Sequence, residues 1–387
     1  MMNKWTVALA ATGMVSLASA VLAEESHPVN TLLPATTLSG YVDTSAIWNF
    51  GSGHNQAVRF VNTGNDRQDG FNVDVVKLAL EKPLDEGTWS AGYKTELWFG
   101  PDAGGLPGSI SGSDLAVKQA YVALRAPVGN GLDFKLGQFD PIIGYEVADA
   151  NGNPNFSRSF GFALEPLSHT GILAAYQFSE IIGATAGVAD TAFGKINQKA
   201  TAGESIKTYM GAVTVKAPES LGWLAGSSLY AGVVDGGGGF NGSGKLASKK
   251  DAVNLYVGAS VATPIKALSL GVGYDYLANG AGVGSYGNAI SAYGTYTLTE
   301  KLKVNIREEY ATSSGANADG SIVTVFGGRD NEKFFGSTLT LDYSLWANVV
   351  TRAEFRWDHA ANGASAIFGT GAKRNDYSLA LNVIYKF

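Results

Sequence analysis

Apolar and polar side chains alternate along the last thirteen residues of the chain, 375–387. One face of this segment is mostly polar and includes Asp376, Asn382 and Lys386. The apolar face begins and ends in aromatic rings: Tyr377, Leu379, Leu381, Val383, Tyr385 and Phe387. Side chains of a β-strand point alternately to its two faces. The pattern therefore predicts a strand with lipid on one side and water on the other.

The same alternation recurs from residue 37 to the C-terminus. Most of the alternating segments are about 10 to 13 residues long, which is the length of a strand tilted across a bilayer. We predict sixteen strands: 37–48, 71–82, 88–99, 115–126, 132–139, 166–178, 181–190, 205–217, 225–234, 251–263, 267–277, 287–298, 301–311, 333–343, 347–358 and 375–387.

The connections between these segments alternate in length. Eight long connections follow the odd-numbered segments, and seven short turns follow the even-numbered ones. Short turns are typical of the periplasmic rim of a membrane barrel, and long loops of its exterior. Open sheet edges are not stable in lipid, so the first segment must pair with the last. The sequence therefore predicts an all-β fold, a closed transmembrane antiparallel β-barrel of about sixteen strands around an aqueous lumen.

The 36 N-terminal residues precede the first predicted strand. Residues 1–23 combine Lys4, an apolar run and small residues before Ala23, which predicts a secretory signal peptide cleaved after Ala23. Residues 24–36 are predicted to be a polar periplasmic leader, and residues 37–387 the barrel. This arrangement predicts a location in the bacterial outer membrane.

Composition argues against several other classes. The chain has no Cys, which excludes disulfides, and its net charge of −6 with dispersed Lys and Arg argues against nucleic-acid binding. No apolar run after residue 23 reaches about 18 residues, so no transmembrane helix is predicted. The four His are scattered, so we expect no metal site. His359 has no nucleophile motif nearby. We expect neither a cofactor nor catalysis.

Five short motifs lie in or beside the third long connection, residues 140–165. They are Gly137-Gln138-Phe139, Gly144-Tyr145-Glu146, Asn153-Pro154-Asn155, Ser157-Arg158-Ser159-Phe160 and Pro166-Leu167-Ser168-His169-Thr170-Gly171. In these motifs the chain resembles the OmpL-like, porin-2 type family of bacterial outer-membrane barrels. The resemblance implies a passive channel whose third loop folds into the lumen and narrows it.

Loop 140–165 is thus the candidate constriction, and the charges it would place in the lumen are Glu146, Asp149, Arg158 and Glu165. The alternative is an exterior loop whose charges are only solvated. Residues 144–145 and 156–164 are too apolar for a freely solvated loop, which favours inward folding.

Charged residues also mark the predicted inner face of the wall. Among them, Arg307, Arg352 and Arg356 stand across the lumen from the base of the loop. In one interpretation they oppose the loop carboxylates, because charges in a narrow pore set ion selectivity. In the other, Arg352 and Arg356 pair with Asp342 and Glu354 in a ladder that only stiffens the wall. The predicted set is Lys94, Glu96, Arg125, Asp133, Lys135, Lys303, Arg307, Glu309, Asp342, Arg352, Glu354, Arg356 and Asp358.

Six aromatic residues are also predicted to face inward: Trp98, Tyr121, Phe139, Tyr230, Tyr256 and Phe334. They could form a stacking track for sugars, or they could pack beneath the exterior loops. The residues alone leave both arrangements open.

These patterns predict an outer-membrane porin, a water-filled channel for passive diffusion of small polar solutes or ions. The alternative is a structural or adhesive barrel that contacts a partner through its exterior loops. The predicted partners are the lipid bilayer and the outer-membrane assembly machinery, since Phe387 resembles the assembly signal of such barrels. Analogy of fold suggests a possible homotrimer.

Overall fold

A computed structural model describes most of the predicted barrel. The predicted signal peptide, 1–23, lies outside the described residues, and so does most of the predicted leader, 24–36. The described residues are 29–30, 35–50, 60–61, 69–85, 89–110, 114–199, 206–237, 251–279, 284–315, 326, 331–363 and 373–387.

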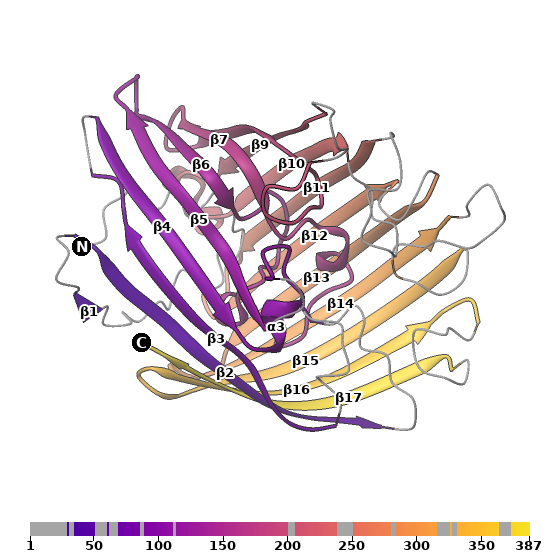
Figure 1. The fold of residues 1–387 in the computed structure, drawn as a ribbon. Helices are drawn as coiled ribbons and strands as arrows, with labels where there is room; N and C mark the ends of the chain where they lie inside the picture. The colour runs from indigo at the N-terminus through magenta and orange to yellow at the C-terminus, as the bar shows by residue number, and fades with distance from the viewer. Residues whose placement is uncertain are drawn as a thin grey trace.

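In the described residues, sixteen antiparallel strands close into a barrel (Figure 1). Closure is made by the last strand, which pairs with the first barrel strand from Tyr377↔Phe50 to Lys386↔Tyr41. A two-residue strand, β1 (Val29–Asn30), pairs with the start of β2. The barrel strands are β2 (Thr37–Phe50), β3 (Gly70–Lys82), β4 (Ser90–Phe99), β5 (Leu115–Ala126), β6 (Leu132–Phe139), β7 (His169–Gln177), β8 (Ile182–Ala189), β9 (Thr208–Lys216), β10 (Ser228–Gly237), β11 (Asp251–Ala262), β12 (Leu268–Ala278), β13 (Tyr286–Thr297), β14 (Leu302–Ser314), β15 (Glu332–Trp346), β16 (Val349–Ala360) and β17 (Asn375–Lys386).

The predicted fold class is confirmed, and each predicted segment corresponds to one strand. Boundaries differ by a few residues: the segment predicted at 225–234 is strand β10, Ser228–Gly237. The difference is expected where small residues weaken the alternation. Among the described residues, no helix is long and apolar enough to span a membrane.

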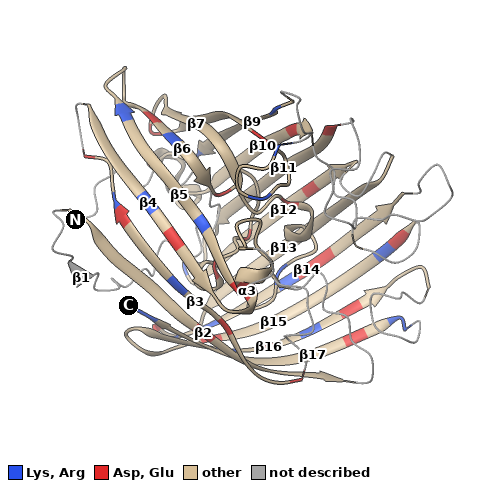
Figure 2. Cartoon of the chain, in the orientation of Figure 1, with Lys and Arg blue, Asp and Glu red and all other residues tan. Residues whose placement is uncertain are grey.

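The two faces of the wall differ as the alternation predicts. On β17, Leu381, Val383 and Tyr385 are exposed on the outside, whereas Asp376 and Asn382 are buried on the inside. Acidic and basic residues occur along strands all round the barrel (Figure 2). Apolar side chains outside and polar ones inside suit a wall between lipid and an aqueous interior.

The seam between the last and first strands ends at Phe387. Its backbone exchanges two hydrogen bonds with Gly40, at 2.9 and 3.0 Å. A Cβ added at Gly40 would lie 2.7 Å from Cζ of the Phe387 ring and 2.1 Å from the Lys77 carbonyl oxygen. Gly40 alternates with the inward-facing Tyr41, so the Phe387 ring lies on the outer, lipid-facing side.

The long connections place apolar side chains inside the barrel. The short helix α3 (Pro101–Gly104) follows β4, and Ala103 and Leu106 pack there with Trp98. Phe60, from the connection after β2, packs against Phe156 with ring centroids 5.1 Å apart. These contacts narrow the space in which the third long connection lies.

Candidate functional site

Loop L3, defined as residues 140–165, runs through the barrel interior between β6 and β7 (Figure 1). Two short 3₁₀ turns, η2 (Ala150–Gly152) and η3 (Phe162–Leu164), are its regular elements. Asn151 is the one exposed residue in it, and all of its residues are described. A loop this buried needs partners for its backbone groups, and the inner faces of strands on both sides supply them.

The N-terminal part of L3 packs closely against glycines of the wall. The Tyr145 ring stacks on Tyr293 of β13, with centroids 4.0 Å apart. A Cβ at Gly271 of β12 would lie 2.0 Å from the Tyr145 hydroxyl, and one at Gly232 of β10 would lie 2.7 Å from Ile143. Glycine at these inward positions therefore makes room for the loop.

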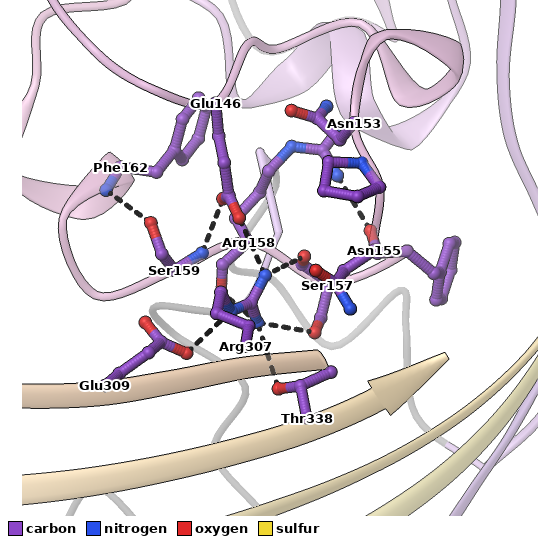
Figure 3. Close-up of polar contacts among 12 residues, drawn as sticks. Glu146, Asn153, Asn155, Ser157, Arg158, Ser159, Phe162, Arg307, Glu309 and Thr338 are labelled. Atoms are coloured by element: carbon purple, nitrogen blue, oxygen red, sulfur yellow. Dashed lines mark hydrogen bonds and ion pairs between the residues drawn. The ribbon is translucent and has the colours of Figure 1, made fainter. Parts of the chain in front are cut away.

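Arg307 of β14 is the centre of the contact between L3 and the wall (Figure 3). Its fully buried guanidinium forms ion pairs with Glu146 of L3 and with Glu309 of its own strand, both at 2.7 Å. It also donates to the Ser157 carbonyl at 2.8 Å and to the Arg158 carbonyl at 3.2 Å. One side chain thus binds two separate parts of the loop.

Two further wall arginines bind the loop through its carbonyl groups. Arg352 of β16 pairs with Asp342 at 2.9 Å and donates to the carbonyls of Ala150 and Asn153 at 2.9 and 2.8 Å. Arg356 pairs with Asp358 at 2.9 Å and donates to the Arg158 carbonyl. Each of these charges is therefore balanced within the wall while it holds the loop.

Wall carboxylates bind the backbone amides of the same stretch. Glu354 of β16 accepts from the amides of Phe156 and Ser157, at 2.6 and 3.0 Å. Glu309 accepts from the amide of Phe160 at 2.6 Å. Charged acceptors make strong hydrogen bonds, so residues 155–160 are fixed from both donor and acceptor sides.

The two sequence interpretations of these arginines are each correct in part. Arg307 opposes a loop carboxylate, as the first interpretation requires. Arg352 pairs with Asp342, as the ladder requires. The predicted pairing of an arginine with Glu354 is wrong for Arg356, whose partners are Asp358 and Glu309. Glu354 instead binds loop amides, which a pairing rule between strands does not anticipate.

The opposite side of L3 reaches the strands near the N-terminus. Asp149 forms an ion pair with Lys77 of β3, and Lys77 also lies 3.2 Å from Glu96 of β4. The Ala150 amide donates to the Tyr41 hydroxyl at 3.2 Å. Burial raises the pKa of the Asp149 carboxyl, although the Lys77 ammonium opposes that effect. L3 is therefore attached to both sides of the barrel.

Lys118 of β5 binds the base of L3 and, like Lys77, was not among the residues predicted from sequence. It forms an ion pair with Asp140 and donates to the Leu167 carbonyl at 3.2 Å. The register of β4 against β5 passes from Gln119 to Val117, so Lys118 is an extra, bulged residue. Asp74 is likewise extra where β3 pairs with β2. A bulge reverses the alternation of faces, so the inward positions of Lys118 and Lys77 were not predicted.

Arg158 is buried within the loop itself. Its guanidinium donates to the carbonyls of Val147, Ala148 and Phe156, at 2.9, 2.8 and 2.7 Å. The side chain also lies over the Phe162 ring, 5.7 Å from its centroid. These contacts fold L3 onto itself, so Arg158 organises the loop from inside.

Glu165, the last predicted loop charge, meets another carboxyl group. Its side chain hydrogen-bonds to Asp275 of β12, and both residues are buried. Burial raises the pKa of Glu165 well above its ordinary value, and the nearby Asp275 carboxylate adds to the rise. Glu165 therefore differs from Glu146 and Asp149, which have cationic partners.

Most of the predicted inward aromatics pack under loops. Phe334 stacks on Phe160 of L3 at 5.6 Å, and the Tyr230 hydroxyl donates to the Ile142 carbonyl. Tyr121 of β5 is different, because it is partly exposed and lies under the Lys135 ammonium at 4.9 Å. The arrangement matches packing under loops better than a continuous track.

Two cations of the β3–β6 wall remain partly exposed near L3. Lys94 of β4 lies 3.5 Å from Glu81 and 3.7 Å from Glu96, and Lys135 of β6 contacts Tyr121. Among the described residues, no group of three or more His, Cys, Asp or Glu could hold a metal ion.

A model of the family described as "Putative beta-barrel porin-2, OmpL-like" matches residues 35–387. The chain belongs to this family. It is therefore a porin of the bacterial outer membrane, a channel for passive diffusion. Among curated protein sequences, none matches the chain significantly.

Solved outer-membrane barrels share the fold of this porin at low sequence identity. The outer-membrane channel DcaP of Acinetobacter baumannii has a TM-score of 0.60 at 15% identity, over 91% of this chain and 97% of its own. The anion-selective porin of Comamonas acidovorans has 0.56 at 15%, over 91% and 99%. The trimer form of OmpT of Vibrio cholerae has 0.58 at 12%, over 91% and 99%. At this identity the likeness concerns the fold alone.

Proposed function

We propose that small polar solutes and ions cross this porin through an aperture between L3 and the inner wall of β3–β6. The main support is that L3 is attached at both sides, to Arg307 and to Lys77. A loop fixed at both sides narrows the lumen while it stays attached. Solutes then diffuse down their gradients without a chemical step.

Charged groups of both signs border this aperture. The exposed fractions of the side chains are 21% for Lys94, 43% for Glu81 and 33% for Asp140. Lys135 adds a cation beside the Tyr121 ring. In a narrow pore the local field of such groups controls which ions pass. We expect the lysines to favour anions at this level of the channel.

Substitution K135E tests this assignment. Replacing a lumen cation with an anion should shift the reversal potential of a purified channel in a salt gradient toward that of K⁺. Lys301 lies exposed in the turn before β14, so K301E makes the same change of charge away from the aperture. Equal reversal potentials for K135E and K301E would contradict the placement of the pore.

We further propose that the porin forms a homotrimer, as the trimer form of Vibrio cholerae OmpT does. The broad apolar outer face offers surface for subunit contact as well as for lipid. The mass of the detergent-solubilised particle, after subtraction of bound detergent, separates three copies from one. A monomer in several mild detergents would overturn the trimer.

A further inference from the structure

Two carboxyl side chains meet where L3 returns to the wall. Glu165 ends L3, and Asp275 is an inward residue of β12; their relative exposures are 6% and 5%. The two side chains are hydrogen-bonded to each other. Ionised carboxylates only accept hydrogen bonds, so one member of this pair must carry a proton.

Two glycines of L3 lie directly against the pair. A Cβ at Gly144 would lie 2.0 Å from Oε2 of Glu165, and one at Gly161 would lie 2.3 Å from Oδ2 of Asp275. The backbone of L3 therefore closes over both carboxyl groups. Gly144 has a φ of +118°, a conformation that glycine adopts without strain.

The titratable neighbours are acids and phenols. Glu146 of L3 is the next carboxylate, and it adds to the negative field at the pair. Tyr145 of L3 and Tyr256 of β11 are the nearby phenols. Within the described barrel, the groups that act electrostatically on Glu165 are thus carboxylates. Arg307 lies beyond Glu146 and is paired with it.

A neutral hydrogen bond also attaches residues 161–165 to the wall. Asn254 of β11 donates from Nδ2 to the Leu164 carbonyl at 2.7 Å. The polar contacts of 161–165 with the wall are thus this amide contact and the shared proton, in addition to the burial of Phe162 and Leu164 among apolar side chains. In the described part of the chain, the wall arginines that fix the rest of L3 contact it between residues 146 and 160.

We propose that the Glu165–Asp275 pair is a proton-dependent latch, which holds residues 161–165 of L3 against β12 and releases them in alkaline solution. On release, one proton passes from the pair to solvent and two carboxylates remain. Like charges at hydrogen-bond distance repel strongly in a water-poor site. The inference rests on the proposed constriction only where it predicts conductance.

The direction of the pH effect follows from the proton. Burial raises the pKa of Glu165 in the attached state, so the attached state retains a proton that the detached state loses. Attachment therefore weakens as pH rises from the ordinary carboxyl range through the raised pKa. Because the wall lies behind residues 161–165, the freed segment can move only toward the lumen, where it obstructs flow.

Planar-bilayer recordings and hydrogen exchange test the latch. The proteins are the wild type, E165Q, D275N and the control E180Q, which changes an exposed carboxyl in the turn before β8. Recordings between about pH 6 and pH 9 cover the range in which a carboxyl group with a raised pKa loses its proton. Exchange of the amides of residues 161–167, corrected for the intrinsic rate, reports attachment directly.

For the wild type and E180Q we expect closing events and corrected exchange to increase with pH. For E165Q and D275N we expect both to be independent of pH, because an amide can hydrogen-bond a carboxylate without a titrating proton. Exchange that is independent of pH in the wild type, or dependent on pH in E165Q, would overturn the latch. A pH-dependent exchange without a change in conductance would support the latch and count against L3 as the constriction.

Discussion

Arg307 joins L3 to the wall through two ion pairs and several hydrogen bonds. Its guanidinium lies between Glu146 and Glu309, and all three side chains are fully buried. A buried arginine of this kind is costly to desolvate and expensive to remove, because removal leaves its carboxylates without a partner.

Substitution R307Q should therefore detach L3 while leaving the barrel closed. Loss of one partner of a buried ion pair typically costs about 3 to 5 kcal/mol, and here the cost falls on the loop, since the strand ladder is unchanged. Limited proteolysis with mass spectrometry should find new cleavage within residues 146–160. R374Q removes an exposed arginine and serves as the control. Equal cleavage of the two variants would refute the role of Arg307.

The charged residues of the site illustrate what the sequence can predict. Arg307 and Arg352 were predicted because each stands at an inward position of a strand with regular alternation. Lys77 and Lys118 were not, because extra residues at Asp74 and Lys118 reverse the alternation. Each lysine stands within an otherwise apolar strand. Local periodicity alone assigns such a lysine to the wrong face when a bulge lies beside it.

At the scale of elements, the fit of L3 depends on glycines of the opposing strands. A methyl group at Gly271 would lie 2.0 Å from the Tyr145 hydroxyl, so G271A must displace the ring from Tyr293 toward the lumen. We expect slower swelling of proteoliposomes in disaccharide solutions. The control is G294A, whose added methyl would lie 3.1 Å from a methyl of Ile306 on the outer face. Faster swelling, or no change, would contradict the packing of L3.

The closing strand β17 permits a second test at this scale. The ring of Phe387 covers Gly40 at the seam, so F387S should lower the yield of folded barrel without changing the pore. Phe178 is also exposed at the periplasmic end, and F178S controls for loss of an aromatic ring. Altered ion selectivity of the assembled F387S barrel would show that Phe387 is not on the lipid face.

For the whole molecule, the barrel was predictable because most strands show their own alternation of apolar and polar side chains. Segment length, alternating connections and the need to close the sheet in lipid together determine the architecture. The inward course of L3 was predicted from resemblance and from its apolar residues, but its contacts with the wall were not. It depends on contacts between residues 146–160 and strands more than a hundred residues later, such as Phe160 with Glu309. Local periodicity contains no information about such contacts.

Single-channel conductance shows whether the barrel is an open channel that L3 narrows. Wild-type protein in planar bilayers should give a steady conductance. A variant in which a short Gly-Ser linker replaces residues 146–160 should give a larger conductance and weaker selectivity, because the aperture is widened while the strands remain paired. A wild-type barrel that does not conduct would show that the protein is not an open channel, and a loop variant with unchanged conductance would show that L3 does not narrow it.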